Sequence, residues 1–187
     1  MNEDKDIKIA GDRPSVTIRS FKPVTETDDD FERQLANGNI AKARALGERV
    51  ADKFCEAGDD IVPESETAKN ADMLMQRQQL LAFAVRIGLE RFCPNATVAD
   101  SATGSFEKSL QKNAPAVYAS ITDTGAFSFY FLAYRRGGDV ERRMGQTFAM
   151  LCSHDGDPIY QELGEALYCW FISYIQTQCE QAGFAAD

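Results

Sequence analysis

The sequence predicts an all-α protein: a single-domain bundle of five to seven helices around a buried C-terminal helix. The first observation behind this fold class is that apolar residues recur at spacings of three and four from residue 31 onward, which is the period of an amphipathic helix. The second is that residues 166–175 are apolar on nearly every side, and a helix without a polar face must be surrounded. The third is the length of 187 residues, which fits one domain.

We expect residues 1–30 to form a short acidic segment, extended or disordered, ahead of the helical domain at 31–187. The stretches DIKI and SVTIR alternate apolar and polar residues, as strands do, and AGDRP between them carries turn residues. This pattern predicts a small hairpin, an added edge strand or a partly ordered tail. The stretch TETDDDF then indicates an acidic hinge, with Asp30 as the N-cap of the first helix.

Two long amphipathic helices are expected next. The first ends near Gly58, and its apolar residues lie three and four apart: Ile40, Ala43, Leu46, Val50 and Phe54. The second covers about residues 65–92, and Pro94 ends it. Its wide apolar face is formed by Met73, Leu80, Leu81, Ala84, Val85, Ile87, Gly88 and Phe92.

The middle of the chain predicts three shorter helices. FEKSLQKN indicates one, and Pro115 suits the first turn of another, PAVYASI. The run GAFSFYFLAY fits a strand as well as a buried helix, because it is rich in aromatic residues. We predict a helix here, with Asp123 as its N-cap and Arg135 and Arg136, followed by two glycines, at its end.

The last two helices have clear limits. A stripe at spacings of four and three marks the first of them: Val140, Met144, Phe148 and Leu151. The second runs from about Pro158 to Ala182, with Trp170 as its largest buried side chain. Between them, HDGDP predicts a corner. His154 suits a helix C-terminus, Gly156 the left-handed conformation of a helix stop, and Asp157 an N-cap ahead of the proline.

Charge and composition narrow the classes of partner. The net charge of −9 disfavours binding to nucleic acid and to anionic lipid, because both require Lys and Arg. The longest apolar run is seven residues, 166–172, whereas a membrane span needs about 20, and residues 1–30 lack the apolar core of a secretory signal. Five widely spaced cysteines form neither a disulfide framework nor a zinc pattern. We therefore expect a cytoplasmic protein.

The corner also offers a set of metal-ligand candidates. A lone histidine excludes the di-iron bundle pattern and a three-histidine zinc site. An all-oxygen magnesium site is the remaining alternative, as in all-helical nucleotide pyrophosphatases built on Glu-x-x-Glu and Glu-x-x-Asp pairs. Here no Glu-x-x-Asp follows the Glu-x-x-Glu, so we favour the corner over a metal-dependent nucleotide hydrolase. The candidate ligands are His154, Asp155, Asp157, Glu162 and Glu165.

A second candidate site is the basic cluster RRGGDVERR at residues 135–143. Two glycines precede a helix start there, and arginines can clamp a phosphate or carboxylate with bidentate hydrogen bonds. The alternative is that these charges only complement helix ends and neighbouring acids. The aromatic run beside the cluster predicts either core or an apolar ligand pocket between helices. The candidate residues are Arg135, Arg136, Arg142, Arg143, Tyr130 and Tyr134.

These patterns favour a non-catalytic cytoplasmic binding or protein-interaction domain that needs no cofactor. Nucleophilic catalysis would have to use His154 with its neighbours Ser153 or Cys152, and no third residue is placed to orient them. Wide apolar helix faces favour a protein partner or self-association. The alternatives are a small-molecule or anion sensor or carrier with an aromatic pocket, and the metal-dependent hydrolase.

Overall fold

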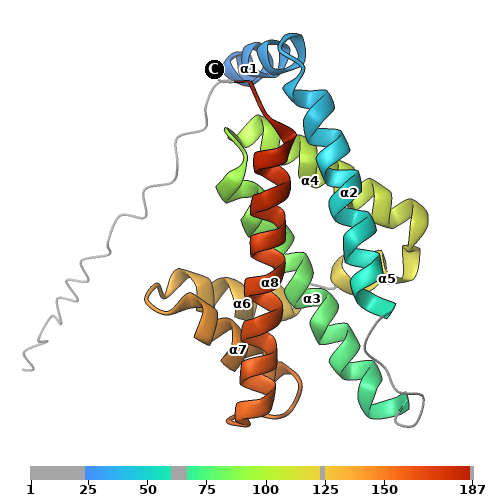
Figure 1. Cartoon of the computed structure of the whole chain (residues 1–187), viewed down its shortest axis with the longest axis vertical. Coiled ribbons are helices and arrows are strands. Elements are labelled where there is room, and N and C mark those ends of the chain that lie inside the picture. Colours follow the sequence, from blue (N-terminus) through green and yellow to red (C-terminus); the bar gives the residue numbers. More distant parts are fainter. Residues whose placement is uncertain (1–23, 60–66, 123–124, 186–187) are drawn as a thin grey trace, which may run out of the picture.

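The structure, a computed structural model, describes residues 24–59, 67–122 and 125–185, and these residues form eight α-helices and no strand (Figure 1). The all-α prediction is confirmed, although the described residues contain one helix more than the predicted maximum of seven. The helices are α1 (Val24–Ala36), α2 (Asn39–Asp59), α3 (Thr67–Phe92), α4 (Ala96–Asn113), α5 (Pro115–Thr122), α6 (Gly125–Arg135), α7 (Val140–Leu151) and α8 (Pro158–Ala182).

Helix α1 was not expected, because it begins inside the segment predicted to be extended or disordered. Its first turns are acidic, and carboxylates stabilise the N-terminal end of a helix. The predicted N-cap, Asp30, therefore lies in the helix interior. Its carboxylate accepts hydrogen bonds from Arg33 on the same helix and from Thr97 on α4. The DIKI and SVTIR stretches and the predicted cap Asp123 lie outside the described residues.

The most enclosed helix is α3 rather than α8. Between residues 79 and 89, every side chain except that of Arg86 is buried. Helix α3 contacts α2, α4, α5, α6, α7 and α8, so it forms the axis of the bundle (Figure 1). Burial on all sides follows from the sequence LLAFAVRIGL, which carries a single charge.

Helix α8 lies against α2, α3 and α7, but it is not enclosed on every side. Its inner face is buried through Leu167, Phe171, Ile175 and Cys179. The predicted anchor, Trp170, is 42% exposed, so that prediction was wrong. The outward-facing positions near Trp170 hold small residues, Ala166, Cys169 and Ser173, which face water at little cost.

The corner between α7 and α8 ends one helix and begins the next, as predicted. However, the residues that end α7 differ from those predicted. Ser153, not Gly156, takes the left-handed conformation that ends α7, with φ +61°. The His154 N–H then donates to the Ala149 carbonyl at 2.8 Å, which closes a Schellman-type cap. Gly156, with φ +80°, belongs to the following turn, and Asp157 caps α8 by accepting from the Ile159 N–H at 2.9 Å.

The end of the described chain is fastened to the α1–α2 corner. The buried Asn39 side chain accepts a hydrogen bond from the Ala185 N–H at 2.8 Å and donates to the Ala185 carbonyl at 3.1 Å. It also donates to Gln34 at 2.7 Å, and Lys42 donates to the Gly183 carbonyl at 2.6 Å. None of the helices in the described part of the chain has the length and apolarity that a membrane span requires.

Candidate functional site

The four candidate arginines surround the α6–α7 junction without converging on one point. Arg135 ends α6, where its guanidinium carbon lies 5.1 Å from the centre of the Phe131 ring. Arg136 and Arg142 are exposed. Arg143 packs against Gly138, and its buried Nη1 has no hydrogen-bond partner among the described residues. At the start of α7 the Asp139 carboxylate accepts from the Arg142 N–H at 3.1 Å, so a side chain already occupies that helix end.

The two candidate tyrosines differ in location. Tyr130 is fully buried and its ring lies 5.7 Å from that of Phe83 on α3, so it belongs to the core. Burial raises its pKa well above 10, and its hydroxyl finds no hydrogen-bond partner among the described residues. Tyr134 is half-buried and meets Phe83 edge to face at 6.2 Å. Only Tyr134 has a side that a ligand can reach.

A groove of about 320 Å³ runs between α3 and α6 beside Tyr134. Two guanidinium groups and two aromatic rings line it over an aliphatic floor, with one carboxylate at the side. The lining residues are Ile87, Glu90 and Arg91 from α3, and Phe131, Tyr134 and Arg135 from α6. Of the predicted ligand-binding residues, the structure therefore brings Tyr134 and Arg135 together in one groove and leaves the other four outside it.

Helix α6 also exposes apolar side chains next to the groove. Phe129, Phe131 and Leu132 are 48%, 45% and 57% exposed. The opposite face of α6 packs on the bundle through Ala126, Tyr130 and Ala133. Helices α6 and α7 lie to one side of the α3–α8 pair (Figure 1). We call the three exposed residues together with the groove the α6 surface.

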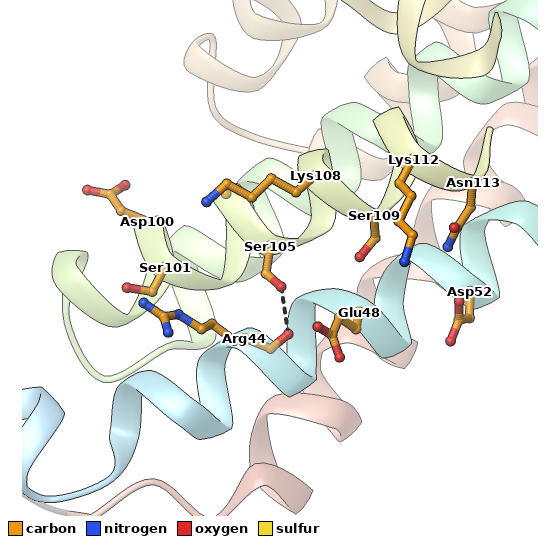
Figure 2. A pocket seen from close by; sticks show the side chains of 11 residues that line it. Arg44, Glu48, Asp52, Asp100, Ser101, Ser105, Lys108, Ser109, Lys112 and Asn113 are labelled. Carbon is orange, nitrogen blue, oxygen red and sulfur yellow. Dashed lines mark hydrogen bonds between the residues drawn. The ribbon is translucent and has the colours of Figure 1, made fainter. Parts of the chain in front are cut away.

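Two further cavities have other properties. The larger, about 890 Å³, is an open groove between α2 and α4, where Ser105 donates to the Arg44 carbonyl at 2.9 Å (Figure 2). Its three cationic side chains (Arg44, Lys108, Lys112) balance three carboxylates (Glu48, Asp52, Asp100), so it has no net charge with which to select a ligand. A pocket of about 160 Å³ lies among α3, α4, α5 and α6.

The five candidate metal ligands do not form a site. His154 stacks on Tyr160, with ring centres 3.8 Å apart, and its Nδ1 lies 3.8 Å from the Asp157 carboxylate that caps α8. Asp155 and Glu162 are exposed, and Glu165 is half-buried on α8. In residues 24–59, 67–122 and 125–185, no three His, Cys, Asp or Glu side chains are close enough to hold a metal ion.

Sequence reasoning missed the α3 side of the groove. Glu90 and Arg91 stand in the last turn of α3, where charged residues are usually only solvated. No local pattern distinguishes them, since the groove exists only because α6 packs against this turn. Phe131 belongs to the aromatic run GAFSFYFLAY, but the sequence does not distinguish it from the residues of that run that lie in the core.

Comparison with known proteins gives no relative. No family model matches the chain, and no curated protein or solved structure matches it either.

Proposed function

We propose that this chain is a non-catalytic, cytoplasmic binding domain, which holds an acidic, apolar segment of another protein on the α6 surface. The observation that carries the proposal is the exposure of Phe129, Phe131 and Leu132 on one short helix. Contiguous apolar patches rimmed by polar residues are typical of protein-interaction sites, whereas single exposed apolar residues are not. Five cysteines with free thiols are consistent with a reducing compartment.

The charges beside this face favour an acidic partner. Arg91 and Arg135 line the groove and Arg136 follows, against the single carboxylate of Glu90. This local excess of positive charge contrasts with the net charge of −9 for the whole chain. Opposite charges across an interface steer association and select the partner.

A second copy of the chain is a poorer occupant of the same face. A twofold interface places the same patch on both subunits, so two patches with an excess of arginine would face each other. Like charges placed together in an interface cost several kcal/mol. An apolar side chain flanked by Asp or Glu, by contrast, would insert between Phe131 and Tyr134 while its carboxylate meets Arg91 or Arg135.

A displayed library of random peptides, selected on the full chain, tests the proposal. We expect the selected peptides to combine an aromatic or aliphatic residue with neighbouring Asp or Glu. Leu132→Glu should weaken their binding about 30-fold, as the loss of a central contact worth about 2 kcal/mol does. Arg135→Glu should weaken it about tenfold and reduce its dependence on salt.

The matched control is Ile159→Ser, which removes an apolar side chain that is 72% exposed on α8, a helix that does not contact α6 in the described part of the chain. This variant should bind the selected peptides as the wild type does. Peptides without acidic residues, or peptides whose binding survives Leu132→Glu, would contradict the proposal. A concentration-dependent dimer that dissociates on Leu132→Glu would instead show that a second copy is the occupant.

A second candidate function, a carrier or sensor of a small aromatic anion, is favoured by the groove itself. Two guanidinium groups and two rings around about 320 Å³ suit an aromatic carboxylate. The dye anilinonaphthalene sulfonate is a suitable probe. If the ligand is a small anion, dye binding should be lost in Arg135→Glu and unchanged in Leu132→Glu, because Leu132 does not line the groove. Equal loss in both variants would favour the protein partner.

A further inference from the structure

Two of the five cysteines contact each other. Cys93, directly after α3, and Cys179, in α8, are both buried, and the thiol of one is hydrogen-bonded to the thiol of the other. They are far apart in the sequence and belong to different elements, so the tertiary fold alone brings them together. Neither lies in the α6 surface.

The packing of α3 against α8 accounts for this contact. At Gly88 the two helices approach so closely that a Cβ atom would lie 2.9 Å from Cγ2 of Ile175. Cys93 follows Gly88 by about one turn, and Cys179 follows Ile175 by one turn. Because α3 and α8 run in the same direction, the two cysteines lie at the same level along the pair of helices (Figure 1). The close approach at the glycine therefore brings the two thiols within hydrogen-bonding reach of each other.

We propose that Cys93 and Cys179 form a modification site, at which a hydroperoxide oxidises the two thiols to an intramolecular disulfide between the ends of α3 and α8. Both thiols are buried, which favours hydrogen peroxide, the smallest such oxidant, over bulky disulfides. The linked state fastens the axis of the bundle to its last helix.

The hydrogen bond assigns the order of the steps. The Cys93 S–H stabilises the Cys179 thiolate, which lowers the pKa of Cys179, and the same hydrogen bond together with burial raises that of Cys93. We therefore assign Cys179 as the nucleophile, and the single variants below test this order. Its thiolate attacks one oxygen of hydrogen peroxide, the O–O bond breaks, and the products are a sulfenic acid on Cys179 and hydroxide, which is protonated to water.

The second step forms the disulfide. The sulfur of Cys93 attacks the sulfur of the sulfenic acid, the S–O bond breaks, and hydroxide leaves as water with the proton that Cys93 releases. In sum, two thiols and one hydrogen peroxide give one disulfide and two waters. The thiols lose two electrons, the peroxide gains them, and a dithiol such as dithiothreitol reverses the change.

Cys152 and Cys169 are the internal comparison. Burial raises the pKa of Cys152 to about 11 and also raises that of Cys169, so neither is a ready thiolate near neutral pH. A serine at either position should leave the oxidation of the Cys93–Cys179 pair unchanged. These two variants are the matched controls.

The test treats the purified full-length chain with hydrogen peroxide, then alkylates the remaining thiols and measures the intact mass and the cross-linked peptides. We expect the loss of two hydrogen atoms, protection of two thiols, and a peptide in which Cys93 is joined to Cys179. Dithiothreitol should restore both thiols. Cross-linking so long a loop should also raise the melting temperature by several degrees, since disulfides of long loops stabilise most.

Single variants separate the two roles. In Cys93→Ser, Cys179 should gain one oxygen and react with the sulfenic-acid probe dimedone, whereas in Cys179→Ser, Cys93 should stay reduced under the same treatment. A disulfide that involves another cysteine, dimedone labelling of Cys93 in Cys179→Ser, or an unoxidised pair after excess peroxide would each overturn the proposal. The cross-link in the wild type is measured independently of how well the variants fold.

Discussion

The central turns of α3, residues 80–89, and the whole of α6 are both almost wholly apolar, yet they are buried to different extents. The central turns of α3 are enclosed on every side apart from Arg86, whereas α6 buries Ala126, Tyr130 and Ala133 and leaves its other face open. An apolar helix face is expected to be buried against something. The comparison shows that the described part of this chain buries such a face on α3 and does not bury the one on α6. In α3 the apolar side chains stabilise the fold, and in α6 half of them are available to a partner.

The sharpest way to break this comparison is the same substitution in both helices. Phe83→Ala on α3 should lower the free energy of unfolding by about 3–5 kcal/mol, because the ring is buried and contacts Phe127, Tyr130 and Tyr134. Phe129→Ala on α6 should cost about 1 kcal/mol or less, because half of that ring already faces water. Urea denaturation measures both, and equal losses would contradict the assignment of the open face.

A second test compares Gly47, at the contact between α2 and α4, with Gly104, which is on α4 but outside that contact. A Cβ at Gly47 would lie 2.2 Å from the Ala102 carbonyl oxygen, so Gly47→Ala should destabilise the chain by about 1–3 kcal/mol. Gly104 on α4 has open space around it. Gly104→Ala should therefore stabilise by up to about 1 kcal/mol through helix propensity. Urea midpoints that shift in the same direction for both would show that the contact is not tight.

Helix α8 falls between the two extremes. Trp170 contacts Phe171 at 5.3 Å between ring centres but is 42% exposed. Trp170→Ala should therefore cost about 1–2 kcal/mol, less than the 3–5 kcal/mol typical of a fully buried aromatic residue. Thermal denaturation checks this, and a loss as large as that of Phe83→Ala would place Trp170 in the core after all.

The smallest expected effect is a dependence on pH at the edge of the bundle. The hydrogen bond from Thr97 lowers the pKa of Asp30 below its ordinary 3.8, so the ionised carboxylate stabilises the contact of α1 with α4. This stabilisation is complete above pH 3.8 and is lost as the pH falls through the lowered pKa. The difference in melting temperature between wild type and Thr97→Val should therefore shrink below about pH 4. A difference that is constant with pH would exclude this origin.

Local signals in the sequence were enough to locate several helices. Asp157 and Pro158 at one end of α8 and Gly183 at the other determine its limits through backbone chemistry, and the structure gives the predicted bounds. Pro115 likewise begins α5. The aromatic run at α6 is a helix, as predicted.

Other features depend on what packs against a segment, and the sequence predicted them poorly. Helix α4 is much longer than FEKSLQKN because its buried side is partly alanine, which carries a weak apolar signal. The acidic residues of α1 were interpreted as a hinge although they suit a helix N-terminus. Of the groove, Tyr134 and Arg135 were identified in advance, but Arg91 was not, because only tertiary packing brings it opposite them.

The hydrogen bonds of the Asn39 side-chain amide make the stability of the protein sensitive to truncation at its carboxyl end. Ala185 occupies a surface position near the carboxyl end, where deletion normally does little harm. Removing it would leave a fully enclosed side chain without two of its polar contacts, at a cost of about 1–3 kcal/mol. A truncation that removes Ala185 would then lower the free energy of unfolding as much as a substitution in the core.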